Sequence, residues 1–164
     1  MSEVLWAPWR MEYILGPKSG PCIFCAHPTD RDRHRENLVL AVTPHALVML
    51  NKYPFASAHV LVAPLAHAAS PEALSDEQYA GVMDALRKSI VAVRQAVSPN
   101  GLNVGMNLGQ AAGAGIADHM HWHIVPRWLG DTNFMPVIAD LKVMPEHLDA
   151  TWQRLRPHFA SLAG

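Results

Sequence analysis

Three histidines alternate with apolar residues in the segment His-Met-His-Trp-His-Ile-Val at residues 119–125. A repeat of two is the period of a β-strand, so His119, His121 and His123 are expected on one face of a strand spanning 118–127. Each imidazole carries ring nitrogens that need hydrogen-bond partners, and a row of three is therefore poorly suited to plain packing. The pattern favours a site where imidazoles contact a metal or a phosphate over a histidine-rich strand with no role.

Composition limits what kind of protein can carry this strand. The chain has 164 residues, of which 50% are hydrophobic and 16% charged, as expected for one compact domain with a real core. A formal net charge of −1 gives no field for capturing a nucleic acid polymer. No apolar stretch approaches the ~20 residues needed to cross a bilayer, and no signal peptide is evident at the start. We therefore expect a cytoplasmic protein that does not enter a membrane.

The rest of the chain predicts an α+β domain on an antiparallel sheet, because runs of strands joined by turns surround one long helix. That helix begins near Ser75, where a capping box with Gln78 precedes an apolar stripe, and a last helix covers 146–159. Further strands are expected at 38–43, 46–50, 59–63 and 102–106, with a glycine-rich loop at 109–115. Residues 1–20 form an aromatic arm expected to pack onto its own domain or a second subunit, and 21–164 form a single domain.

The alternating segment resembles the motif of the histidine-triad (HIT) family of nucleotide hydrolases and transferases, His-φ-His-φ-His-φ-φ with φ apolar, and every position fits. The segments 22–25, 51–55 and 58–64 are similar to upstream parts of the same family, and 130–136 resembles an extension found in relatives of bacterial diadenosine-tetraphosphate phosphorylases. The resemblance implies an antiparallel sheet of about five strands with a long helix and a C-terminal helix. It also implies a homodimer.

The resemblance assigns roles to four histidines. A ring nitrogen of histidine can attack a phosphoryl group and later leave, provided that its other nitrogen is held by an acceptor and the phosphate charge is met by donors. By resemblance His121 is the nucleophile, and a backbone carbonyl near His119 orients it. His123 is then a phosphate-facing donor, and His59 matches a fourth histidine that the family places beside the triad.

Three further positions concern the substrate. Asn51 matches a family Asn that binds the ribose hydroxyls, a role that suits an amide with both donor and acceptor. Asn107, before the glycine-rich loop, matches an Asn that contacts the scissile phosphate. Gly115 stands four residues before His119, where many members carry Ser, Thr or Gln, so that only a backbone N–H is left to contact the phosphate.

Cys22 and Cys25 form a C-x-x-C pair with three interpretations: a redox pair, two buried structural thiols, or half of a tetrahedral zinc site. Some family members and the related galactose-1-phosphate uridylyltransferases complete such a site with two histidines. One follows a strand-ending proline by three residues, as His67 does here, and the other is the first histidine of the motif, His119. The resemblance thus implies a structural zinc held by these four residues.

Three classes of function compete. The first is an enzyme that cleaves a phosphoanhydride or phosphoramidate bond through a nucleotidyl-His121 intermediate, with dinucleoside polyphosphates such as diadenosine tetraphosphate (Ap4A) as expected substrates. The alternative is a nucleotide-binding or signalling module with little turnover, which the glycine at position 115 keeps open. A protein that binds metal directly with the three triad histidines is the third class. Whether water or phosphate accepts the nucleotide does not follow from the sequence.

Overall fold

A computed structural model describes residues 21–28, 30–131 and 146–162 of the chain. The aromatic arm predicted at 1–20 and most of the 130–136 segment lie outside the described residues. Of the helices in those ranges, none combines the length and apolar character that a membrane span requires.

The described residues form an α+β fold, as the sequence predicts. A five-stranded antiparallel sheet has the order β1-β2-β3-β5-β4. The strands are β1 (Val39–Val42), β2 (Ala46–Leu50), β3 (Val60–Pro64), β4 (Gly101–Met106) and β5 (Trp122–Arg127). The helices are α2 (Ile23–Ala26), α3 (Asp76–Val97) and α5 (Leu148–Leu155), with 3-10 turns at Arg31–Arg33, Pro71–Ala73, Gln110–Ala112 and Arg156–Phe159.

The helix α3 confirms the predicted capping box. The Ser75 side chain accepts the backbone N–H of Gln78, and the Gln78 side chain accepts the N–H of Ser75. The helix ends at Ser98, whose left-handed backbone (φ 44°) turns the chain into β4. The predicted C-terminal helix is also present, divided at Pro157 into α5 and a 3-10 turn.

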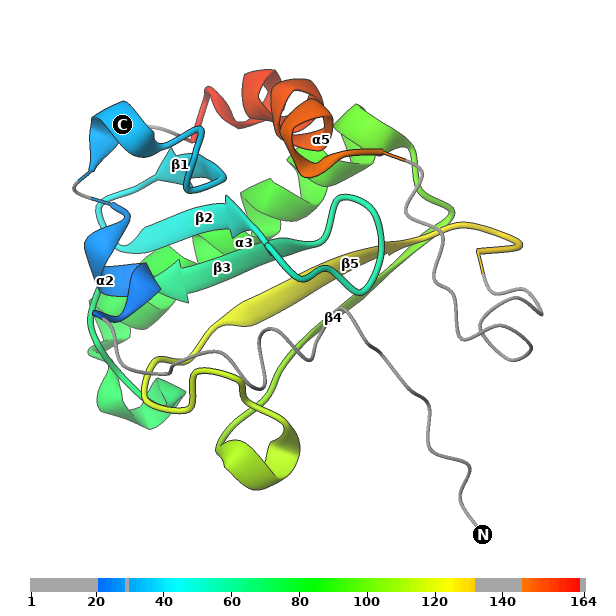
Figure 1. Ribbon diagram of the computed structural model, residues 1–164. Helices are drawn as coiled ribbons and strands as arrows, with labels where there is room; N and C mark the ends of the chain where they lie inside the picture. The colour runs from blue at the N-terminus through cyan, green and yellow to red at the C-terminus, as the bar shows by residue number, and fades with distance from the viewer. Residues whose placement is uncertain (1–20, 29, 132–145, 163–164) are drawn as a thin grey trace, which may run out of the picture.

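The two faces of the sheet are covered differently. In Figure 1 the long helix α3 lies behind the sheet and α5 beside it, while the short helix α2 lies on the other side. The larger core fills the space under α3 and α5, with Val62, Ile124 and Phe159 fully buried. The opposite face carries a smaller core of Phe24 on Leu47, Leu61 and their neighbours. The histidine row belongs to this second face, beside α2.

The strand that carries the histidine motif was predicted to begin at residue 118, which is too early. Regular pairing begins only at Trp122, so His119 and His121 precede β5. The cause lies in the neighbouring strand: β3 ends at Pro64, which has no N–H to extend the ladder. The N–H of Met120 instead donates to the carbonyl of Ala68 at 2.7 Å. The side chains still alternate between the two faces where the pairing is absent, since Met120 and Ile124 are buried in the core as predicted.

Candidate active site and metal cluster

A hydrogen bond to the backbone determines which ring nitrogen of His121 carries the hydrogen. Nδ1 of His121 lies 3.0 Å from the carbonyl oxygen of His119. A carbonyl only accepts, so Nδ1 carries the hydrogen, and Nε2 keeps its electron pair. The ring is 7% exposed, and this burial lowers the pKa of His121 because it disfavours the imidazolium. His121 therefore has the form that a nucleophile at phosphorus requires.

A second pair of histidines forms a relay across β3 and β5. The backbone N–H of Phe55 donates to Nδ1 of His59 at 3.1 Å, so the hydrogen of the fully buried His59 lies on Nε2. Nε2 of His59 is 2.9 Å from Nδ1 of His123 and donates to it. In the neutral ring the remaining hydrogen of His123 is then on Nε2. The ring centroids of His121 and His123 are 4.9 Å apart, so a hydrogen-bond donor lies beside His121.

Asn51 and the loop that follows it contact His59 and so position the His59–His123 pair. The amide nitrogen of Asn51 lies 3.3 Å from Nδ1 of His59, and its oxygen accepts the N–H of Tyr53 at 2.9 Å. The ring of Phe55 stacks on His59 with centroids 4.9 Å apart. Asn51 thus lies beside the histidines and positions His59, a role that the sequence did not indicate. Its expected binding of ribose stays a prediction.

The turn into β3 contains a residue in an uncommon conformation. Ala58 has φ 57°, in the left-handed region that alanine rarely adopts, and it is 3% exposed. It immediately precedes His59, whose carbonyl accepts the N–H of Asn51 at 2.8 Å. The surrounding contacts hold Ala58 in this conformation, and the turn directs His59 towards His123.

Cys22, Cys25, His67 and His119 converge at the start of α2. Their ligand atoms all lie within 4.8 Å of one another. Both cysteines are free thiols, and Cys25 is exposed, which contradicts the interpretation of two buried structural thiols. The sequence placed these four residues together only by resemblance, and the structure brings all four to one point.

Four of the distances between these ligand atoms fit a tetrahedral metal ion. Zinc–sulfur and zinc–nitrogen bonds of about 2.3 and 2.0 Å put tetrahedral ligand atoms roughly 3.3–3.8 Å apart. Sγ of Cys22 lies 3.3 Å from Nδ1 of His119, and Sγ of Cys25 lies 3.3 Å from Nδ1 of His67 and 3.5 Å from Nδ1 of His119. Nδ1 of His67 lies 3.3 Å from Nδ1 of His119. His119 Nε2 donates to the Pro64 carbonyl at 2.9 Å, which leaves Nδ1 unprotonated and directed at the cluster.

Phe24 is a site residue that the sequence reasoning missed. It lies between the two cysteines, is fully buried, and contacts two histidine rings, with centroids 5.1 Å from His119 and 4.9 Å from His121. The available signal was an aromatic residue inside the C-x-x-C pair. Helix α2 therefore connects the cysteine cluster directly to the ring of His121.

The glycine-rich loop follows β4 and leads back to the histidines. Asn107 comes directly after β4, and its amide nitrogen lies 3.5 Å from the carbonyl oxygen of Gly113, a long bond within the loop. Gly115 is exposed in the turn that leads to His119. The substrate roles expected of Asn107 and Gly115 accordingly remain predictions.

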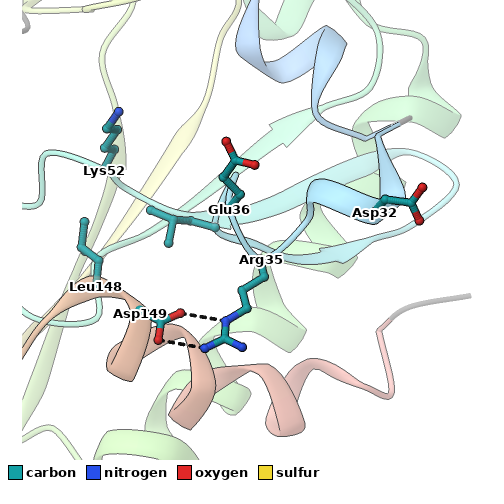
Figure 2. Close-up of a pocket in the computed structure, with 7 residues that line it drawn as sticks. Asp32, Arg35, Glu36, Lys52, Leu148 and Asp149 are labelled. Atoms are coloured by element: carbon teal, nitrogen blue, oxygen red, sulfur yellow. Dashed lines mark hydrogen bonds and ion pairs between the residues drawn. The ribbon is translucent and has the colours of Figure 1, made fainter.

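A cavity of about 560 Å³ opens elsewhere, between the segment before β1 and the start of α5. Its lining is mixed in charge: Asp32, Arg35, Glu36, Leu38, Lys52, Leu148 and Asp149. Figure 2 shows Arg35 bonded to both carboxylate oxygens of Asp149, at 2.8 and 3.0 Å. This exposed ion pair joins two segments 114 residues apart, and such pairs contribute little to stability. No histidine of the candidate site lines the cavity.

The sheet and its row of imidazoles define a histidine-triad protein. The sequence model of the HIT domain matches residues 33–128, and the chain belongs to the HIT domain family. It is 36% identical over 165 aligned positions to an AP-4-A phosphorylase of Mycobacterium tuberculosis, covering 95% of this chain and 84% of that protein. It is 38% identical over 88 positions to an adenosine 5′-monophosphoramidase of Schizosaccharomyces pombe, covering 54% and 62%.

Solved structures agree on the fold. A hypothetical histidine triad nucleotide-binding protein from Sulfolobus tokodaii aligns with a TM-score of 0.65 and 23% identity, covering 86% of this chain and 93% of that one. A zinc-bound histidine triad family protein from Mycobacterium smegmatis aligns with a TM-score of 0.63 and 23% identity, covering 87% and 95%. At this identity the likeness shows the fold alone.

Proposed function

We propose that this HIT-family enzyme cleaves a phosphoanhydride or phosphoramidate bond of a nucleotide through a covalent intermediate on Nε2 of His121. One observation carries the proposal: the 3.0 Å bond from His121 Nδ1 to the His119 carbonyl, which leaves Nε2 with a free electron pair. A buried ring with a lowered pKa keeps that electron pair available near neutral pH.

The reaction needs two displacements. Nε2 of His121 attacks the phosphorus, the bond to the leaving group breaks, and the leaving group departs with the electron pair. The Nε2–H of His123 meets the charge that develops on the phosphate oxygens, and the His59 relay fixes the direction of that donor. An acceptor then attacks the same phosphorus, the nitrogen–phosphorus bond breaks, and His121 regains its electron pair. Water loses a proton when it is the acceptor, and the departing nitrogen of a phosphoramidate takes up one, so the overall reaction balances.

Dinucleoside polyphosphates such as Ap4A are the proposed substrates. The phosphorylase relative in M. tuberculosis supports them, and the S. pombe relative supports a shorter phosphoramidate substrate as well. With water as acceptor, Ap4A yields AMP and ATP, whereas inorganic phosphate yields ADP and ATP. Ribose binding by Asn51 and phosphate binding by Asn107 and the Gly115 backbone are part of the same proposal.

The identity of the products tests the proposal. Purified protein is incubated with Ap4A, with and without inorganic phosphate, and with AMP phosphoramidate, and the nucleotides are separated by chromatography. His121→Asn serves as the matched control, because it keeps a polar side chain but has no attacking ring nitrogen. Tight nucleotide binding without turnover of any substrate would favour the binding module that Gly115 kept open.

We also propose that the cluster of Cys22, Cys25, His67 and His119 holds one structural zinc per chain. The support is its spacing and the unprotonated Nδ1 of His119. A bound zinc would fix α2 to the segment before β5 that carries His121, since His119 supplies both a ligand nitrogen and the carbonyl that orients His121. The zinc stays outside the chemical steps.

Elemental analysis of protein purified without chelator tests this assignment. One zinc per chain is expected, and Cys22→Ser should lose it together with several degrees of thermal stability, because binding free energy of a structural metal is also folding free energy. Zinc-free protein, with the variant as stable as wild type, would contradict the assignment. More than one metal per chain would revive direct metal binding by the triad.

The expected assembly and cellular location are proposals as well. We infer a homodimer from the edge strand β4 and from exposed apolar side chains, which include Val104 on β4 and Tyr79 and Val91 on α3. The division into an arm at 1–20 and a single domain at 21–164 is also a proposal, because the HIT-domain match covers residues 33–128. A cytoplasmic location remains a prediction.

A further inference from the structure

The sheet face that carries the catalytic histidines continues onto the edge strand β4. Residues directly opposite in an antiparallel pair share a face. Gly105 lies opposite His123, and Asn103 lies opposite Val125. Gly105 and Asn103 are therefore on the histidine face. Along β5 the same face continues every second residue, from His123 through Val125 to Arg127.

This end of the face is open within the described part of the chain. Asn103 and Arg127 are exposed. A Cβ added to Gly105 would meet no heavy atom within 4 Å, so the space above the sheet beside His123 is not filled by a described neighbour. A substrate that reacts at the histidines has room to extend in this direction.

Asn103, Arg127 and Asp131 form a hydrogen-bonded polar cluster at the far end of the open face. Arg127 Nη1 donates to Asn103 Oδ1 at 3.0 Å, while Nε and Nη2 donate to the two oxygens of Asp131 at 2.6 and 2.9 Å. Asp131 also accepts the backbone N–H of Trp128 at 3.1 Å. The guanidinium plane is thus fixed across β4 and β5 before any ligand arrives.

The position of this cluster complements that of Asn51. Asn51 follows β2, on one side of the histidine row, and Asn103 lies on β4, on the other side. If the ribose of the transferred nucleotide lies at Asn51, the leaving group must extend along the remaining side. Four residues of strand separate His123 from Arg127, about 13 Å at 3.3 Å per residue. That distance suits a leaving group with several phosphates and a terminal nucleoside.

We propose that Asn103, Arg127 and Asp131 form a subsite for the terminal nucleotide of the leaving group of a dinucleoside polyphosphate. The cluster offers a guanidinium for a phosphate, and an amide and a carboxylate for sugar hydroxyls. Because the carboxylate of Asp131 balances the charge of Arg127, these three side chains suit a nucleotide, which has sugar hydroxyls as well as phosphates, better than a polyanion without a sugar. The subsite rests on the proposed nucleotidyl transfer and deepens it, since it selects substrates by their leaving group.

Two substrates that transfer the same nucleotide to His121 but differ in their leaving group separate the effect of the subsite from the effect of the chemistry. The leaving group of Ap4A is ATP, whereas that of AMP phosphoramidate is ammonia, which is too small to reach Asn103 and Arg127. The measured quantity is the ratio of kcat/KM for Ap4A to kcat/KM for AMP phosphoramidate. Arg127→Gln should lower this ratio about tenfold, the scale of one lost charge-assisted hydrogen bond. Gly105→Val, which fills the open space beside His123, should lower it as well.

Controls separate the subsite from folding and from the proposed function. Arg33→Gln removes another exposed arginine that bonds a carboxylate, that of Glu36, and should leave the ratio unchanged. Asn103→Ala keeps the Arg127–Asp131 pair and tests the subsite if Arg127→Gln unfolds. Ratios within twofold of wild type for Asn103→Ala and Gly105→Val would overturn the subsite alone. A wild-type protein inactive on both substrates would overturn the proposed function, and the subsite with it.

Discussion

At the scale of single residues, backbone groups that can only accept or only donate a hydrogen bond determine the site. The His119 carbonyl sets the tautomer of His121, and the Phe55 N–H sets that of His59 and, through it, of His123. His121 is thereby left with a free electron pair, and His123 with a hydrogen to donate. Backbone groups, which no side-chain substitution removes directly, thus supply most of the preorganisation.

The different tautomers of His121 and His123 predict different costs of replacing the two rings. His121→Ala should reduce turnover of Ap4A by several orders of magnitude, because the covalent route is lost, while nucleotide binding persists. His123→Ala should cost less, on the order of 10²–10³-fold, the usual scale for one charge-stabilising donor. Steady-state kinetics and mass spectrometry of a quenched reaction check both. Wild-type turnover by His121→Ala would refute the mechanism.

The burial of His121 predicts the pH dependence of the reaction. Its pKa lies below the ordinary histidine value near 6.5, chiefly because burial disfavours the imidazolium, so at pH 6.5 more than half of the rings are neutral. Activity should therefore fall only as the pH drops through this lowered pKa. A pH profile of kcat/KM for Ap4A, whose internal phosphates stay ionised in this range, should place the acid limb below 6.5. An acid limb above that value would contradict the assignment.

Phe24 offers a test of how α2 affects His121, the proposed nucleophile. Phe24→Ala should hydrate His121, lower kcat and move the acid limb to higher pH, at a cost of about 3–5 kcal/mol in stability. Phe24→Leu keeps an apolar cover and should retain most of the activity and the wild-type acid limb. The pH profile separates positioning from loss of fold. Equal profiles for the two folded variants would show that the ring does not act on His121.

At the scale of elements, the sequence predicted what depends on local periodicity and missed what depends on neighbours. Alternation identified the apolar side of the triad segment, and the Ser75 capping box identified the start of α3. The length of β5 was wrong because Pro64, on another strand, limits the pairing. The histidine relay and the contact of Phe24 depend on tertiary packing between segments distant in sequence, which periodicity does not encode.

Gly81 illustrates packing that overrides helix propensity. It lies inside α3, where alanine is ordinarily favoured over glycine by about 1 kcal/mol. A Cβ at this position would lie 2.7 Å from the Cβ of His45, in the turn between β1 and β2. Gly81→Ala should therefore lower the melting temperature, whereas adding His45→Gly, which removes the Cβ of residue 45 together with the ring, should restore part of it. Thermal unfolding of both single variants and the double variant measures the coupling, and additive effects would disprove the contact.

At the scale of the whole molecule, the cysteine cluster and the relay join segments that lie far apart in the chain. Cys22 meets His119 across 97 residues, and His59 meets His123 across 64. The α2 side of the sheet combines these polar contacts with a small apolar core, while the α3 side has the larger apolar core. We infer that a metal at the cluster would stabilise the side of the molecule that has the smaller core.

The edge of the sheet predicts how two molecules associate. Among the described residues, β4 is the last strand in the order and pairs with β5 alone, so its other edge offers backbone groups to a second strand. Val104 on β4 is 41% exposed. A two-fold axis beside β4 would pair the two strands and cover this side chain at once.

Light scattering at micromolar concentration should find a dimer. Val104→Lys places a charge in the interface and should give monomers, whereas Ala160→Lys, at an exposed position near the C-terminus, should leave the dimer intact. A wild-type monomer, or a Val104→Lys dimer as stable as wild type, would place any interface elsewhere.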